Sequence, residues 1–92
     1  MTIDEIKQNC ILARKLMERS RSEHFAVGAF NVDNQETLVA ICRTAQKLHS
    51  PVLVEVSQGE VDAIGLANMR CLVDNYKKEY GLEMYIDRKS VV

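Results

Sequence analysis

The sequence lacks the features that would place it in a membrane, on a nucleic acid or outside the cell. No apolar stretch approaches the roughly 20 residues that a membrane span needs. The first twenty residues mix charged and apolar side chains throughout, unlike the apolar core of a signal peptide. Because 12 Lys and Arg balance 13 Asp and Glu, no excess of positive charge favours a nucleic acid or an anionic membrane surface. We therefore expect a cytoplasmic protein that binds neither.

Metal-ligating and disulfide-forming residues are also sparse. The three cysteines, Cys10, Cys42 and Cys71, are odd in number, far apart and outside any C-x-x-C pair. That pattern argues against a disulfide framework and a cysteine-based zinc site, so free thiols are expected. His24 and His49 do not stand at ligand spacing from each other or from a cysteine, and we interpret both as structural. The sequence thus predicts no metal ligand within the chain.

The length and composition allow one small domain that begins with a helix. Of the 92 residues, 47% are hydrophobic, which is enough for a core of modest size. Apolar residues in the opening segment repeat at the three-four spacing of one helical face. They are Ile3, Ile6, Cys10, Ala13 and Met17. Thr2 and Glu5 form an S/T-x-x-E capping box, which predicts the start of this helix.

The middle of the chain predicts a strand, a helix and a second strand. The short apolar segment 26–32 predicts a strand that leads directly into a helix. This helix ends near Leu48, because the residue before Pro51 is pushed out of the helical region. The nearly continuous apolar segment 51–56 predicts a second strand that is covered on both faces, as parallel strands are.

A third helix and a third strand complete an α/β pattern. After residues 57–60 a loop leads to apolar positions at helical spacing over 66–80, which predict a helix that Gly81 ends, and residues 84–86 begin a strand. The strands follow one another at about 26 to 30 residues, the length of repeated βαβ crossovers, which predicts a parallel sheet. Eight such units close a (β/α)₈ barrel. Three strands leave two open edges, so we expect the chain to associate or aggregate.

Polar side chains stand at the carboxyl ends of the expected strands, where parallel α/β folds bind ligands. Asn31 closes the first strand, and Ser57 and Asp87 follow the second and third. A carboxamide and a hydroxyl suit a hydroxylated or phosphorylated substrate, and an aspartate can transfer a proton. Alternatively, Asn31 is a turn residue and Ser57 bonds its own backbone. Glu55, inside an apolar strand, indicates either a barrel interior or an exposed edge.

Two motifs resemble those of the class II ketose-bisphosphate aldolases, the family of the fructose- and tagatose-bisphosphate aldolases. They are AVGAFNV at 26–32, followed by Asn34, Glu36 and Thr37, and SPVLVEVSQG at 50–59. The resemblance covers residues 1 to about 86, in order and with the family's spacing. It implies an amino-terminal segment of a TIM barrel over 1–86 and a divergent or truncated tail over 87–92.

The resemblance also implies an activity and site residues. The family is a zinc-dependent lyase that cleaves a ketose 1,6-bisphosphate to dihydroxyacetone phosphate and an aldehyde phosphate, with zinc as the Lewis acid. Asn31 and Ser57 match its substrate-binding positions. The family's third strand runs into Leu-Asp-His, whose Asp donates and accepts the proton and whose His binds zinc. Here the residues are Ile86, Asp87 and Arg88, so Asp87 matches the catalytic aspartate.

The third strand also departs from the family's pattern. Arg88 has no lone pair available for zinc, so the ligand is missing from this chain. A second interpretation makes residues 87–92 unrelated sequence in which Asp87 matches by chance. We expect the chain to be inactive alone, whereas the full-length enzyme binds the sugar bisphosphate. The alternative function is a non-catalytic α/β interaction module that completes its sheet with a second copy or a complementing chain.

Overall fold

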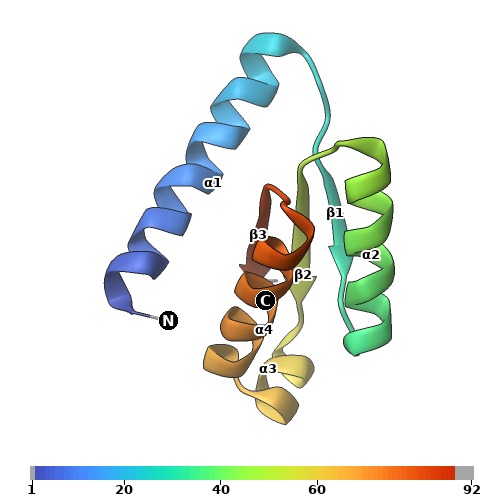
Figure 1. Ribbon diagram of the computed structural model, residues 1–92. Coiled ribbons are helices and arrows are strands. Elements are labelled where there is room, and N and C mark those ends of the chain that lie inside the picture. Colours follow the sequence, from blue (N-terminus) through green and yellow to red (C-terminus); the bar gives the residue numbers. More distant parts are fainter. Residues whose placement is uncertain (1, 89–92) are drawn as a thin grey trace.

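The computed structural model describes residues 2–88 as four helices around a three-stranded sheet (Figure 1). In chain order the elements are α1 (Ile3–Glu23), β1 (Gly28–Asn31), α2 (Gln35–Leu48), β2 (Val52–Val56), α3 (Gln58–Ile64), α4 (Leu66–Tyr80) and β3 (Met84–Arg88). The alternation of helix and strand that the sequence predicts is confirmed. Among these residues, no helix combines the length and the apolar character that crossing a membrane requires.

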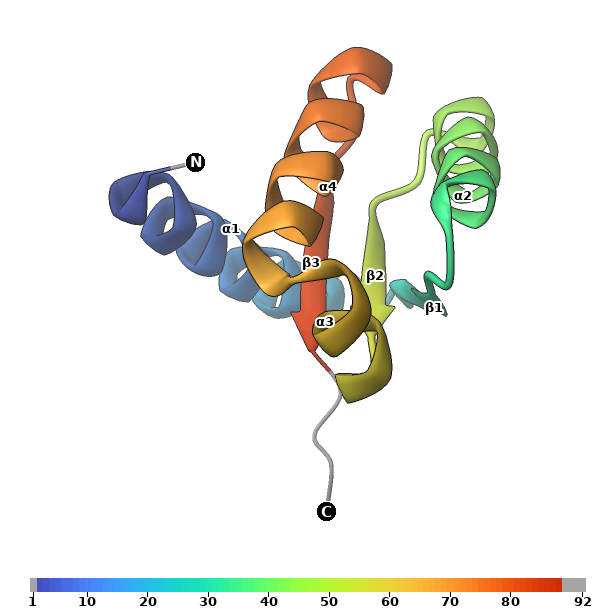
Figure 2. The same cartoon turned by 90° about the horizontal axis from the view of Figure 1, so that it is seen from below.

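The sheet is parallel, with β2 between β1 and β3. Figure 2, viewed from the end at which the strands point, shows α2 and α4 on one side of the sheet and α1 beside β3. The carboxyl ends of all three strands therefore lie at one edge, next to α3. The α/β fold class and the parallel sheet are confirmed.

Local side chains account for where the helices begin. The hydroxyl of Thr2 accepts a hydrogen bond from the backbone N–H of Glu5 at 3.1 Å. The helix α1 begins at Ile3, directly after Thr2, as predicted. The carboxamide oxygen of Asn34 accepts one from the N–H of Thr37 at 2.8 Å and fixes the start of α2. Each of these side chains satisfies an amide that the first helical turn leaves without a partner.

Left-handed residues end three of the helices. His24 and His49 close α1 and α2 with φ of 57° and 51°, and Gly81 closes α4 with φ of 64°. The left-handed conformation lets the backbone N–H of each cap return to a carbonyl of the last turn. The structural interpretation of both histidines fits these positions.

The core lies on one side of the sheet, where α2 and α4 pack against it. Its buried members are Val32, Leu38, Cys42, Ala45, Val52, Val54, Val56, Met69, Val73 and Met84. On the other side of β2, Leu53 and Glu55 are only half-buried. The prediction that β2 is covered on both faces is therefore correct for one face only, because within residues 2–88 no helix pair like α2 and α4 lies over the second.

Three boundaries differ from the sequence-based expectation. Most of the loop expected between residue 60 and Leu66 belongs to α3, which starts after Ser57 because Ser57 and Glu60 form a capping box. The first strand is shorter than the predicted 26–32. The third strand continues past 86, so Asp87 lies within β3 and does not follow it. The remainder of the expected tail, residues 89–92, lies outside the described residues.

Candidate functional site

Three polar residues form one row across the carboxyl end of the sheet. Asn31 pairs in register with Glu55, and Glu55 pairs with Asp87. Residues in register on neighbouring strands point to the same face, and successive strands lie about 4.8 Å apart. Since Val54 and Val56 face the core, this row faces the opposite side. The sequence-predicted Asn31 and Asp87 are thus brought together on one face of one sheet.

Asn31 is the last residue of β1, and its side chain is exposed. The alternative interpretation was that Asn31 is the turn residue that enters the helix. Asn34 caps α2 instead, with hydrogen bonds from the N–H and, at 2.7 Å, from the hydroxyl of Thr37. The start of the helix therefore does not need the Asn31 carboxamide, which lies in the row with Glu55.

Ser57 has the backbone role that the alternative interpretation gave it. Its hydroxyl oxygen accepts a hydrogen bond from the N–H of Glu60 at 3.4 Å, and the Glu60 carboxylate accepts one from the N–H of Ser57. A hydroxyl can donate its hydrogen while its oxygen accepts. Ser57 is half-buried and directly follows β2, so the capping role leaves it at the carboxyl end of the sheet.

The two carboxylates of the row differ in their surroundings. Glu55 is half-buried in the central strand, which rules out the exposed-edge interpretation of this residue. Asp87 is exposed on β3, at the side of the sheet away from β1. An exposed carboxylate at the same end of the sheet as a carboxamide and a hydroxyl can exchange a proton with a polar ligand that spans these groups.

A comparison with known protein families shows to which family the chain belongs. Residues 12–87 match the family described as "Fructose-bisphosphate aldolase class-II". The chain belongs to this family. The match spans β1, β2 and β3 as far as Asp87, the last member of the polar row. The parallel sheet with alternating helices is the amino-terminal part of the class II aldolase barrel, as the sequence analysis expected.

A curated relative is also an aldolase. The chain is 33% identical over 69 residues to "Sulfofructosephosphate aldolase" from Alkalicoccus urumqiensis. The alignment covers 75% of this chain and 24% of that relative, so the chain spans about a quarter of the relative's length. Both comparisons point to a lyase of the aldolase type.

Class II aldolases generally use zinc, and the donor set of this segment does not fit that ion. Within residues 2–88, no group of three or more His, Cys, Asp or Glu side chains is placed to hold a metal. His24 and His49 precede β1 and β2 and so lie at the amino ends of the strands, opposite the polar row. The thiol of Cys42 lies 3.9 Å from the sulfur of Met84, and burial raises its pKa. We therefore derive no step through zinc from these residues.

Tyr85 lies two residues before Asp87 and faces the same side of the sheet. It is 6% exposed, and its hydroxyl donates a hydrogen bond to Glu83 at 3.0 Å. The pKa of Tyr85 is raised to about 12, mainly by burial and to a smaller extent by the hydrogen bond to Glu83. Lys77 of α4 lies 4.2 Å from the centre of its ring. The sequence pattern gave no signal for this cluster, because the contact between Lys77 of α4 and Tyr85 of β3 forms only in the folded chain.

Proposed function

We propose that this chain forms one wall of the active site of a cytoplasmic class II aldolase. The reaction is the cleavage of a ketose 1,6-bisphosphate to dihydroxyacetone phosphate and an aldehyde phosphate. The observation that carries the proposal is the row of Asn31, Glu55 and Asp87 at the carboxyl ends of parallel strands, where barrel enzymes bind their substrates. Membership in the aldolase family supplies the reaction class.

Each residue has a role that follows from its chemistry. Asn31 and Ser57 bind the substrate, because a carboxamide and a hydroxyl can donate hydrogen bonds to phosphate and hydroxyl oxygens. Asp87 takes the proton from the substrate hydroxyl as the carbon–carbon bond breaks, and it returns the proton in the condensation. Asp87 suits this role because its carboxylate is exposed at the carboxyl end of β3.

The metal of the reaction belongs to residues outside this segment. Residues 2–88 hold no cluster of ligands for it, and Arg88 stands at the position of the family's ligand histidine. We therefore propose that the chain is inactive alone. The test is an assay of the purified chain with zinc chloride and fructose 1,6-bisphosphate, tagatose 1,6-bisphosphate or sulfofructose phosphate. No cleavage is expected with any of them, and turnover of one would contradict the proposal.

Binding can be tested separately from turnover. An NMR titration of the isotopically labelled chain with dihydroxyacetone phosphate should shift the amides of Asn31 and Ser57 in a saturable way. Asn31→Ala removes one hydrogen bond and should weaken binding about tenfold. Asn75→Ala is the matched control, because Asn75 is exposed on α4, which packs on the opposite face. Equal binding by the two variants would argue against the site.

Ser57 needs a control for its capping role. Ser57→Ala removes both the cap and the hydroxyl, so its effect on binding includes any loss of α3. Ser57→Asp keeps an acceptor for the N–H of Glu60 and adds a negative charge that repels phosphate. We expect Ser57→Asp to preserve stability and abolish phosphate binding. Retained binding in this variant would remove Ser57 from the site.

A non-catalytic interaction module is the second candidate, and the edge of β1 favours it. Phe30 is 51% exposed and Leu48 is 68% exposed, at an apolar groove of about 330 Å³ between β1 and α2. A partner strand or helix that covered this groove would bury both side chains. Sedimentation of the chain over a range of concentrations separates the candidates: a stable homo-oligomer with no affinity for sugar phosphates favours the module.

A further inference from the structure

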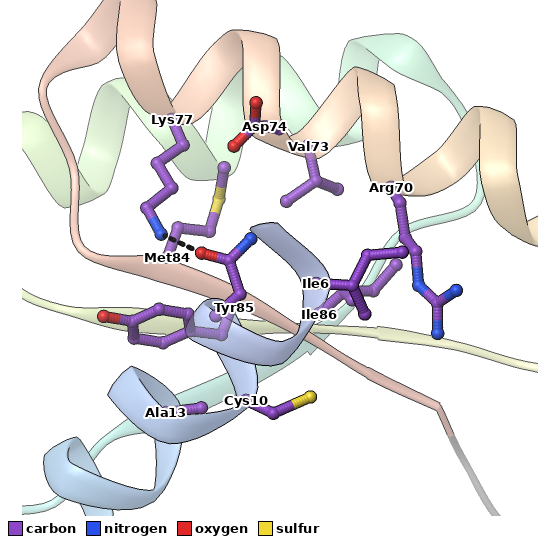
Figure 3. A pocket seen from close by; sticks show the side chains of 11 residues that line it. Ile6, Cys10, Ala13, Arg70, Val73, Asp74, Lys77, Met84, Tyr85 and Ile86 are labelled. Atoms are coloured by element: carbon purple, nitrogen blue, oxygen red, sulfur yellow. Dashed lines mark hydrogen bonds between the residues drawn. The ribbon is translucent and has the colours of Figure 1, made fainter. Parts of the chain in front are cut away.

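A cleft of about 140 Å³ lies between α1, α4 and β3, as Figure 3 shows. Among the residues 2–88 that line it, none belongs to the polar row that the proposed function uses. An apolar cavity of about 150 Å³ can hold a molecule of the size of benzene, so this cleft has room for a small apolar body. All three elements contribute apolar side chains to its walls: Ile6, Ala13, Val73, Met84 and Ile86.

One end of the cleft presents a positive charge that has no partner in the fold. Arg70 of α4 lines this end, away from Lys77 at the other (Figure 3). Arg70 is half-buried, and within residues 2–88 its guanidinium makes no ion pair or hydrogen bond. The carboxylate four positions on, Asp74, pairs with Lys78 at 2.9 Å. Because an unpaired charge that is partly removed from water is costly, this end of the cleft favours an anionic ligand.

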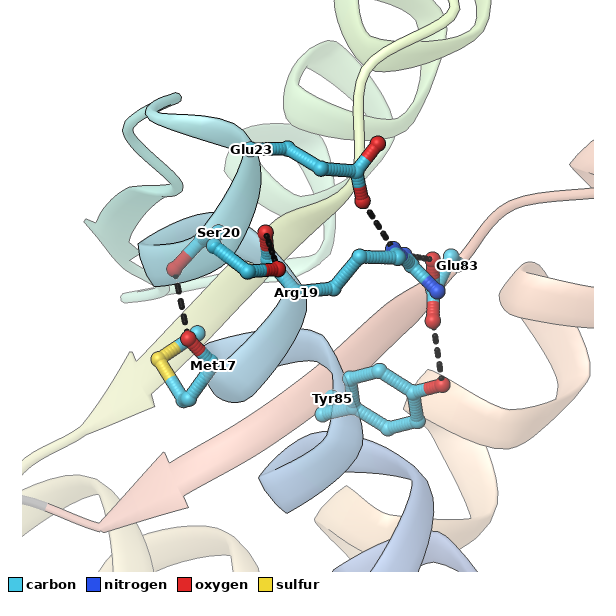
Figure 4. A network of polar contacts seen from close by, with 7 residues as sticks. Met17, Arg19, Ser20, Glu23, Glu83 and Tyr85 are labelled. Atoms are coloured by element: carbon cyan, nitrogen blue, oxygen red, sulfur yellow. Dashed lines mark hydrogen bonds and ion pairs between the residues drawn. The ribbon is translucent and has the colours of Figure 1, made fainter.

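The charge at the other end of the cleft already has partners. The Lys77 ammonium donates a hydrogen bond of 3.4 Å to the carboxamide oxygen of Asn9 and lies 4.2 Å from the centre of the Tyr85 ring. The Tyr85 hydroxyl donates to Glu83, and the same carboxylate pairs with Arg19 of α1 (Figure 4). These contacts fix the Lys77 end, so the guanidinium at the opposite end is the group that a ligand would satisfy.

We propose that this cleft binds a small monocarboxylate with a compact apolar body, of which benzoate is an example. The carboxylate lies on the Arg70 guanidinium, which can hold it through two parallel hydrogen bonds. The apolar body lies between Ile6, Val73 and Ile86. These apolar walls distinguish the ligand from inorganic phosphate, whose remaining oxygens would lose water there without gaining partners. The site goes beyond the proposed function, because it lies outside the polar row and takes no sugar phosphate.

The ligand also stabilises the docked position of α1. Among the 21 residues of α1, all within the described part of the chain, Leu16 alone is buried. Because α1 supplies Ile6 and Ala13 to the walls, the complete site exists only while this helix is docked. A ligand that binds one of two states shifts the equilibrium toward that state. Binding in the cleft therefore reduces the opening of α1.

An NMR titration of the labelled 92-residue chain with benzoate tests the site. The amides of the lining residues should shift in a saturable way, with a Kd on the order of 1 mM. Benzamide has the same shape without the charge and should bind about tenfold more weakly or worse. Inorganic phosphate should give no saturable shift at the cleft. Failure of benzoate to saturate these shifts, or equal binding of benzamide or phosphate, would overturn the proposal.

Two variants act on different walls of the cleft. Arg70→Gln removes the charge, and Ala13→Leu fills the cleft from the α1 side, so each should weaken benzoate binding about tenfold. Arg43→Gln is the matched control, because Arg43 is an exposed arginine on α2, outside the cleft. If one variant does not fold, the other still tests the site. Binding equal to that of the parent in either folded variant would contradict the assignment.

Hydrogen exchange tests the part of α1 in the site. Benzoate at ten times its Kd should slow exchange of the α1 amides about tenfold in the parent, because the ligand binds only while α1 is docked. The same benzoate concentration should slow exchange about twofold at most in Arg70→Gln, which binds about tenfold more weakly. Unchanged exchange in the parent at saturation would show that α1 forms no wall of the site and would overturn the proposal.

Discussion

Asn31 and Asp87 lie in the same row of the sheet, one strand to either side of Glu55. Two strand spacings separate them, about 10 Å, which is the scale of a small phosphorylated sugar. No element of this structure lies between them in the sheet except β2. The pairing of three strands therefore produces a polar wall from residues that are far apart in the sequence.

The cap of α2 should contribute measurably to stability. Asn34 accepts hydrogen bonds from both the N–H and the hydroxyl of Thr37. Asn34→Ala should lower the free energy of unfolding by about 1 kcal/mol, because it leaves the first-turn amide without this partner. Denaturant unfolding measures the loss against Asn75→Ala, an exposed asparagine inside α4. Equal stability of the two variants would show that the cap has no effect.

Truncation of two leucines of α2 should change the stability of the fold by very different amounts. Leu38 is fully buried in the core, whereas Leu48 is 68% exposed at the end of the helix. Leu38→Ala should cost about 2–5 kcal/mol, because it removes buried methyl groups and leaves a cavity. Leu48→Ala should stay within about 0.5 kcal/mol of the parent. The midpoints of denaturant unfolding measure both changes in stability. A loss of stability well above about 0.5 kcal/mol for Leu48→Ala would mean that the apolar groove is occupied in solution.

Tyr85 should ionise at unusually high pH. Its pKa is raised from 10.0 to about 12, so the folded chain favours the neutral phenol. The stabilisation that results is fully present below pH 10 and is lost as the pH rises toward 12, because the unfolded chain ionises first. The difference in tyrosinate absorbance between the parent and Tyr85→Phe should therefore appear near pH 12. A midpoint at the ordinary tyrosine value would show that α1 and α4 do not cover this ring.

Lys77 makes a comparison of variants necessary when stability is measured. Burial lowers the pKa of Lys77, which contributes to the pH dependence with the opposite sign. Lys77 is present in both proteins. The change in the free energy of unfolding between about pH 9 and about pH 11 is therefore measured in the parent and in Tyr85→Phe, and the difference between the two changes is due to the Tyr85 phenol. We expect the parent to lose more stability than Tyr85→Phe over this interval.

The element order follows from local sequence signals. Thr2 and Asn34 carry the helix caps, and the apolar positions of α2 and α4 repeat at helical spacing, so these helices could be placed in advance. The pairing of parallel strands followed from the length of the crossovers. Asn31 and Asp87 could be selected because parallel strands deliver their last residues to one edge of a sheet.

The remaining features depend on tertiary contacts or on a short signal. The seven-residue α3 has too few turns to show a periodic apolar face, and only the capping box of Ser57 and Glu60 could have revealed it. Arg19 of α1 pairs with Glu83, 64 positions away, and this contact has no local signal in the sequence. The cluster of Lys77 and Tyr85 likewise forms only when α4 packs beside β3.

The central claim is that Asn31 and Asp87 belong to the site of a class II aldolase. Its most direct test is a graft in which residues 12–87 replace the corresponding segment of the Alkalicoccus relative, while all other residues remain those of the relative. The measurement is kcat and KM for sulfofructose phosphate. The account predicts an active graft in which Asp87→Asn lowers kcat about 10²- to 10⁴-fold, Asn31→Ala mainly raises KM, and Asn75→Ala changes neither. Full activity of the Asp87→Asn graft would contradict the account.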